Sequence, residues 1–143
     1  MKQDKTLIIL VGLPRSGKST IACQLQDTGN AMRLNADTIR YNMYGENYIG
    51  SLEPYVWAEF EHMYKYLLQT GINICIDNTN IKQSNRETLI KSAKEYGYKK
   101  IYEFFIDTPM ETCFQRAMET GKEYLLDVIA RMEVQILTAS SYK

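Results

Sequence analysis

The chain has 143 residues, an apolar fraction of 45%, and 17 Lys and Arg residues against 17 Asp and Glu residues. Its length suits one globular domain, and its zero formal net charge excludes the broad positive field with which sequence-blind nucleic-acid binders wrap a duplex. No apolar run approaches the roughly 18 residues of a membrane span, and the N-terminus has no signal-peptide pattern, so we expect a cytoplasmic protein with no membrane partner.

Apolar runs alternate with segments of helical periodicity along the chain. We expect strands over residues 6–11, 31–34, 72–76 and 101–106. We expect helices over residues 19–27, 37–44, 54–70, 84–97, 108–120 and 125–139, and a loop over 45–53. The spacing of Ser84 and Glu87, and of Thr108 and Glu111, predicts a capping box at two of the helix starts. This alternation predicts an α/β fold with a mainly parallel sheet of four or five strands, flanked by helices.

The stretch GLPRSGKST, residues 12–20, satisfies the Walker A pattern between a predicted strand and a predicted helix. Its glycines let the backbone curl so that amides point at phosphate oxygens, and the helix start adds partial positive charge. Lys18 would reach the β- and γ-phosphates of ATP, and the Ser19 hydroxyl would ligate Mg²⁺. The expected nucleotide contacts are Gly12, Pro14, Arg15, Ser16, Gly17, Lys18, Ser19 and Thr20.

Nucleotide binding alone leaves a switch, a motor, a hydrolase or a kinase open. The chain has no N-K-x-D stretch, which a guanine-specific GTPase would normally show. Its small size indicates a kinase, although the choice between ATP and GTP is left open by these residues.

The stretch RLNADTIR, residues 33–40, follows the second predicted strand. Ligands meet at the carboxyl ends of the strands in an open parallel sheet, so Asp37 is expected opposite the phosphate loop. A hydroxyl acceptor needs a carboxylate to take or orient its proton, and Arg40 could hold that carboxylate or touch the substrate. Alternatively, Asp37 is only the N-cap of the following helix.

The third predicted strand ends in IDNTN, residues 76–80. Asp77 stands where Mg²⁺–water contacts usually occur beside a Walker A loop, and Asn78, Thr79 and Asn80 would face substrate at the same crevice. A plain turn would use the same residue types.

The segment 113–132 has Arg116 before a short helix break and Arg131 after it. Mobile lids in phosphotransferases bring arginines onto the transferring phosphoryl group, so both are candidates for phosphate contacts. The alternative is that both arginines are ordinary solvated surface.

Four features in this order resemble the kinase module of phage polynucleotide 5′-hydroxyl kinases and their small P-loop kinase relatives. They are GLPRSGKST, N-x-D-x-x-R at 35–40, a strand ending in D-x-T-N at 77–80, and the arginine–lid–arginine tail. The resemblance covers about residues 6–135 and implies a single P-loop kinase domain over 1–143 with a short C-terminal lid.

The resemblance implies transfer of the ATP γ-phosphate, with Mg²⁺, to a 5′-OH, in the host cytoplasm if a phage encodes the chain. It implies Lys18 on the nucleotide, Asp37 as general base, Arg40 beside it, and a tail arginine, Arg116 above all, on phosphate. The chain departs from the phage member at Ala36, where that member has a basic residue, and at Thr120, where it has a second lid arginine. In that member's D-T-N stretch the carboxylate aligns with Asn78, one position after Asp77.

Three functions follow from these features. The first is a polynucleotide kinase, for which the tyrosines at 41, 44, 48 and 55 and Trp57 would offer stacking platforms; alternatively, these side chains simply pack against or decorate the helices. The second is a kinase of another hydroxyl acceptor, such as hydroxymethyluracil in phage DNA, a nucleoside or a nucleotide, which the neutral charge and Ala36 favour. The third is an ATP-binding regulatory or toxin-like module. The sequence does not determine the oligomeric state.

Overall fold

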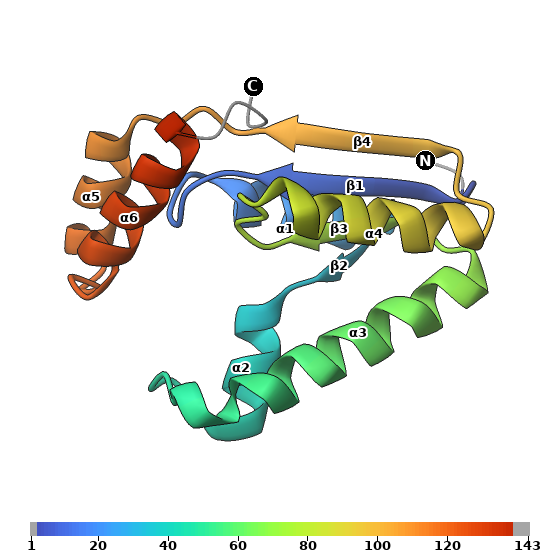
Figure 1. Ribbon diagram of the computed structural model, residues 1–143, viewed down its shortest axis with the longest axis horizontal. Coiled ribbons are helices and arrows are strands. Elements are labelled where there is room, and N and C mark those ends of the chain that lie inside the picture. The colour runs from blue at the N-terminus through green and yellow to red at the C-terminus, as the bar shows by residue number, and fades with distance from the viewer. Residues whose placement is uncertain (1–2, 139–143) are drawn as a thin grey trace.

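The computed structural model describes residues 3–138 and contains an α/β fold with one four-stranded sheet (Figure 1). The strands are β1 (Thr6–Val11), β2 (Met32–Leu34), β3 (Ile74–Asp77) and β4 (Lys100–Phe105). The helices are α1 (Lys18–Asp27), α2 (Ala36–Tyr44), α3 (Glu53–Thr70), α4 (Gln83–Glu95), α5 (Met110–Glu119) and α6 (Leu125–Thr138), and a short 3-10 turn, η1 (Gly50–Leu52), precedes α3. The predicted parallel α/β sheet flanked by helices is therefore confirmed.

The sheet has the strand order β2-β3-β1-β4, and every neighbouring pair is parallel. All six residues of β1 are buried, as expected of a central strand covered on both faces. Leu7 and Ile9 of β1 join the core formed with α3 and α4, whereas Ile8 and Leu10 face Ala22 of α1. The carboxyl ends of four parallel strands thus meet at one edge, where the predicted site residues follow them.

Two helical pairs stand at this edge of the sheet. Figure 1 shows α5 and α6 beyond the carboxyl ends of β1 and β4, while α2 and the first turns of α3 project away from the sheet. Leu13 of the phosphate loop packs with Cys113 and Ala117 of α5 and Ile129 of α6. The α5–α6 pair is therefore attached to the phosphate loop through a small apolar core of its own.

The predicted helix starts were partly wrong. The N-cap of α4 is Lys82 and that of α5 is Pro109, and neither cap has a side-chain hydrogen bond, so neither capping box forms. Thr108 instead donates its hydroxyl to the carbonyl of Ser16, because the strand end brings it beside the phosphate loop. The predicted loop over 45–53 contains η1, and Glu53 already belongs to α3. Residue 139, the last of the predicted final helix, lies outside the described residues.

None of the helices formed by residues 3–138 combines the length and the apolar character that crossing a membrane requires.

Candidate active site

The phosphate loop connects β1 to α1 through backbone conformations that glycine makes easy. Gly17 is the N-cap of α1 and has a φ of 109°, and Arg15 also lies in the left-handed region with a φ of 66°. A Cβ on Gly12 would lie 2.9 Å from Oγ of Ser16 and 3.1 Å from the carbonyl oxygen of Ile106. The first glycine of the motif is thus required by close packing and the second by its backbone angle.

Lys18 lies buried at the centre of this loop. Its Nζ donates to the carbonyl oxygens of Leu13 at 2.6 Å and of Gly12 at 3.1 Å. Burial lowers the pKa of Lys18 from 10.5 to about 8, against the opposing influence of the carboxylates of Asp77 and Asp37. Both carboxylates therefore act electrostatically on the phosphate-loop lysine, as expected if all three groups border one crevice.

Neighbouring elements hold the loop by its backbone. The amide of Gly12 donates to the carbonyl of Thr79 at 3.0 Å, which ties the loop to the residues after β3. Thr108 donates its hydroxyl to the carbonyl of Ser16 at 2.8 Å, which ties it to the residues after β4. The loop is therefore held from two strand ends, so its shape depends on the sheet.

The predicted lid arginines are placed differently from each other. Arg116 lies on α5, and its Nη1 donates to the carbonyl of Arg15 at 3.1 Å, so its guanidinium reaches the phosphate loop. Arg131 lies exposed on α6, and no hydrogen bond or ion pair described within residues 3–138 joins it to the loop. In the same part of the chain, Nε of Arg15 is buried and has no hydrogen-bond partner. The structure thus brings Arg116, and not Arg131, to the loop.

The residues after β2 place a carboxylate at the same edge of the sheet. Asn35 is the N-cap of α2, because its Oδ1 accepts from the amide of Thr38 at 2.9 Å, and its Nδ2 donates to the carbonyl of Asp77. Asp37 is therefore not the cap, and the alternative interpretation of it as an N-cap is wrong. Its side chain is 84% exposed in the first turn of α2.

Arg40 lies one turn after Asp37 and is held by three side chains. Its Nη1 donates to Oδ1 of Asp37 at 2.6 Å, while its Nε and Nη2 donate to the two carboxylate oxygens of Glu53 at 2.9 and 2.7 Å. Its guanidinium carbon lies 5.7 Å from the ring centroid of Trp57. The hydrogen bond to Glu53 is the largest of the influences that raise the pKa of Arg40, which stays a cation.

Two of the side chains predicted to face substrate after β3, those of Asn78 and Asn80, bind backbone groups. Oδ1 of Asn78 accepts from the amide of Ala36 at 2.9 Å, and Nδ2 of Asn80 donates to the carbonyl of Leu10 at 2.8 Å. Thr79 contributes its carbonyl to the phosphate loop, as described above. These residues therefore join β1, β2 and β3 at their carboxyl ends, a positioning arrangement that the turn-like sequence did not reveal.

A Mg²⁺ ion would find few protein ligands here. Ser19 lies exposed in the first turn of α1, so its hydroxyl is accessible, as is its neighbour Thr20. Asp77 is buried; its Oδ2 accepts from Nε of Arg33 at 2.8 Å and forms an ion pair with Nη2 of the same guanidinium at 2.8 Å. Residues 3–138 contain no cluster of three His, Cys, Asp or Glu side chains that could hold a metal ion. With the Ser19 hydroxyl accessible, these residues fit a Mg²⁺ that Ser19 would hold together with nucleotide phosphates and water, while Asp77 would supply negative charge nearby.

Sequence reasoning missed three residues that organise this edge. Glu53 is 13 positions from Arg40, Arg33 is 44 from Asp77, and Thr108 is 92 from Ser16. Helical spacing reveals partners three or four positions apart and cannot reveal these pairs. An acidic residue at a helix start was the only local signal, and for Glu53 it indicates only dipole stabilisation.

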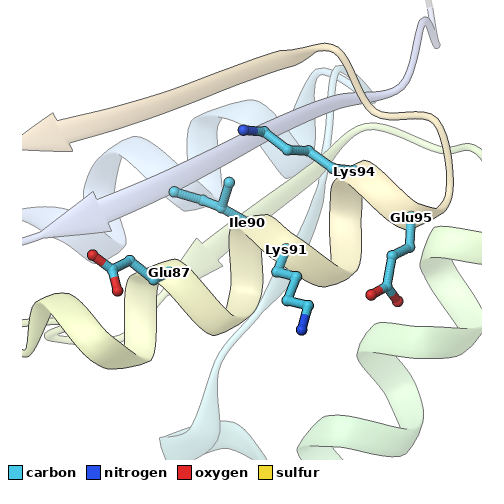
Figure 2. Close-up of a pocket in the computed structure, with 5 residues that line it drawn as sticks. All are labelled: Glu87, Ile90, Lys91, Lys94 and Glu95. Carbon is cyan, nitrogen blue, oxygen red and sulfur yellow. The ribbon is translucent and has the colours of Figure 1, made fainter.

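An open hollow over α4 is separate from this site. Figure 2 shows that it is lined by five side chains of that one helix, Glu87, Ile90, Lys91, Lys94 and Glu95. None of the predicted site residues borders it. The helix α4 runs along the sheet in the direction away from the phosphate loop (Figure 1). The hollow does not belong to the candidate active site.

A family model described as an AAA domain, AAA_33, matches residues 7–131. The chain is also similar to L-seryl-tRNA(Sec) kinase of Methanococcus maripaludis, with 29% identity over 135 residues that make up 88% of this chain and 50% of that protein. It is 32% identical over 123 residues to adenylyl-sulfate kinase of Saccharomyces cerevisiae, covering 80% of this chain and 59% of that one. The chain spans about half the length of these curated relatives.

Solved structures resemble the fold described above. A chain in the structure of the Pnkp1/Rnl/Hen1 RNA repair complex has a TM-score of 0.76 and 29% identity, over 92% of this chain and 44% of that one. The APS kinase CysC of Mycobacterium tuberculosis, solved in complex with AMPPNP and APS, has a TM-score of 0.57 and 21% identity, over 78% of this chain and 68% of that one. At this level of identity, the similarity to CysC shows only that the two chains share a fold.

Proposed function

The chain belongs to the family of AAA domains that the AAA_33 model describes, and from this premise we propose that it is an ATP-dependent P-loop kinase that phosphorylates a hydroxyl group. The nucleotide would be held by the phosphate loop, with Ser19 on Mg²⁺. We further propose that the acceptor is the 5′-OH end of DNA or RNA.

One observation carries the proposal of a kinase. Asp37 presents an exposed carboxylate that accepts from Arg40, and this carboxylate acts electrostatically on the buried phosphate-loop lysine. A nucleotide switch needs the loop and the lysine but has no use for a carboxylate fixed by an arginine at this position. A kinase needs such a group, because the acceptor hydroxyl must be oriented and must lose its proton as the phosphoryl group arrives.

The reaction can be written with these groups. The acceptor oxygen forms a bond to the γ-phosphorus, the bond from that phosphorus to the β–γ bridging oxygen breaks, and the hydroxyl proton passes to Asp37. ADP leaves with the bridging oxygen. Lys18 and Arg116 would balance charge on the phosphates, and a bound Mg²⁺ would neutralise charge on the β- and γ-oxygens.

The polynucleotide acceptor is supported by two findings of different kinds. The N-x-D-x-x-R stretch forms the Asn35 cap and the Asp37–Arg40 pair, so its three specified residues all have a structural use. The likeness to a Pnkp1-complex chain at 29% identity extends over 92% of this chain.

A second candidate acceptor is the hydroxyl group of a small molecule that carries little negative charge, such as a nucleoside. The observation that favours it is the charge of the α2–α3 region. Residues 36–70 contain five acidic residues and two basic lysine or arginine residues, and one of those two, Arg40, is already paired with two carboxylates. A phosphate-rich strand would be repelled by such a surface.

Transfer of label from γ-labelled ATP, with Mg²⁺, to a panel of acceptors tests the proposal. The panel contains a 5′-OH oligodeoxynucleotide, a 5′-OH oligoribonucleotide, hydroxymethyluracil DNA, nucleosides and mononucleotides, and a 5′-phosphorylated oligonucleotide serves as the matched blank. Label on the 5′-OH oligonucleotides alone supports the polynucleotide assignment, and label on nucleosides supports the second candidate. ADP release that no acceptor stimulates would refute a kinase for these hydroxyl classes.

A further inference from the structure

Glu53 is the residue that determines how Arg40 can meet Asp37. It is the first residue of α3, and its side chain is only 18% exposed, whereas that of Asp37 is 84% exposed. The two carboxylate oxygens of Glu53 accept from Nε and Nη2 of Arg40, which is the bidentate fork that gives an arginine–carboxylate pair a fixed plane. The remaining terminal nitrogen, Nη1, is the one that donates to Asp37.

The ring of Trp57 also contacts the face of the Arg40 guanidinium. Trp57 lies one turn after Glu53 on α3, with its ring centroid 5.7 Å from the guanidinium carbon, and its own ring packs edge-on against the buried Phe60 at 5.3 Å. Glu53 and Trp57 of α3 thus fix the side chain of Arg40 on α2, the first by hydrogen bonds to the edge of the guanidinium and the second by contact with its face. The exposed Asp37 carboxylate by itself would sample several rotamers, and the fixed Nη1 limits it to the one that accepts this bond.

We propose that Glu53 is a positioning residue for phosphoryl transfer, which acts by holding Arg40 in the plane that orients the Asp37 carboxylate. This inference rests on the proposed function, because it assigns a role toward the base of that reaction. The group that meets the acceptor is Asp37, and Glu53 acts on it through Arg40. The hydrogen bond from Arg40 lowers the pKa of Glu53, so its carboxylate stays ionised and keeps the fork at neutral pH.

A purely structural role for Glu53 makes different predictions. Its charge in the first turn of α3 stabilises the helix dipole, and its pair with Arg40 joins α2 to α3. A structural role would lower the unfolding temperature and reduce activity and ATP binding together. A positioning role lowers kcat and leaves the KM for ATP unchanged, since the phosphate loop does not contact Glu53 in the structure described.

The test compares Glu53→Gln with Glu53→Asp in the full chain, using ATP and a 5′-OH oligonucleotide. Gln removes one of the two oxygens and the charge. Asp keeps the first-turn charge but withdraws the carboxylate by one methylene, so it separates the dipole effect from the fork. Glu61→Gln is the matched control, because Glu61 is also on α3, is 65% exposed and pairs only with Lys65 among the ion pairs described for residues 3–138.

We expect Glu53→Gln and Glu53→Asp to lower kcat about 10- to 100-fold, the range for a displaced catalytic group, with the KM for ATP within about twofold of the unmodified chain. Glu61→Gln should leave kcat within about twofold. In an Asp37→Asn background, Glu53→Gln should cause no further loss of kcat, because the carboxylate through which Glu53 acts is already absent.

The outcomes separate the two proposals. Wild-type kcat in both Glu53 variants, with slow transfer in Asp37→Asn, overturns the positioning role and leaves the kinase proposal in place. An equal fold loss from Glu53→Gln with and without Asp37 also overturns it, since the effect would not pass through that carboxylate. Full transfer by Asp37→Asn overturns the proposed general base and this inference with it.

Discussion

The affinity for ATP should fall steeply above pH 8, because the phosphate-loop lysine loses its proton there. Burial lowers the pKa of Lys18 from 10.5 to about 8 before phosphate binds. Triphosphate oxygens favour the ammonium form, so the pKa must rise in the complex and binding must take up protons at alkaline pH. The perturbation is therefore a change of pH alone, with no substitution in the chain.

The size of the effect follows from this pKa. If only the ammonium form of Lys18 binds ATP, the dissociation constant is proportional to 1 + 10^(pH − pKa). Between pH 7.5 and pH 9.5 the affinity should fall about 25-fold, or about 1.9 kcal/mol, a range that avoids titration of the nucleotide itself. At pH 8.5 each bound ATP should take up about three-quarters of a proton.

Calorimetry in two buffers of different ionisation enthalpy measures both quantities. Lys18→Arg provides the control, because its guanidinium does not titrate in this range and its affinity, whatever its value, should not depend on pH. An unchanged dissociation constant between pH 7.5 and pH 9.5, with no proton uptake, would refute the claim that burial holds the Lys18 ammonium near its titration point.

The ionisation of Lys18 affects folding stability in the opposite direction from that of a lysine in an ion pair. A lysine whose pKa is lowered on folding binds fewer protons in the native chain than in the unfolded chain between pH 8 and 10.5. Its cost to stability is present in full below pH 8 and disappears as the pH rises through this window. The protein thus keeps a charge in an unfavourable place, which is understandable if the phosphates of a nucleotide compensate it.

Three further predictions concern single substitutions. Asp37→Ala should reduce transfer at least about 100-fold with ATP affinity within about twofold, because the residue is exposed and caps no helix; loss of ATP binding in the folded variant would argue against its role as base. Gly12→Ala should lower stability by about 1–3 kcal/mol in thermal unfolding, because the added Cβ would lie 2.9 Å from Ser16 and 3.1 Å from a backbone oxygen, whereas Gly50→Ala, whose Cβ meets only Tyr48 at 3.6 Å, should be tolerated. Arg116→Ala should lower kcat more than ATP affinity, since its contact would strengthen as charge develops in the transition state; equal kcat in the variant would remove it from the site.

The candidate site illustrates how far a short motif can be interpreted. N-x-D-x-x-R was assigned to an acceptor base, and the structure gives each specified residue a distinct place: Asn35 caps α2, Asp37 is exposed, and Arg40 is fixed beside it. The side chains of Asn78 and Asn80 were assigned to substrate, but they bind backbone groups of neighbouring strands. Their roles in catalysis stay predictions, with the first set better supported by its geometry than the second.

The sequence by itself determined the features that depend on near neighbours along the chain. The phosphate loop, the buried central strand and the alternation of strands with helices all follow from spacing within about ten residues, and the parallel α/β sheet follows from that alternation. Only the tertiary structure decided which groups meet at the strand ends. Arg33 meets Asp77, and Glu53 meets Arg40, because the β2-β3 pairing and the α2–α3 packing bring distant positions together. Two side chains can form an ion pair or a hydrogen bond only when they lie close together in space. The residue types alone do not specify which positions distant in the sequence will do so.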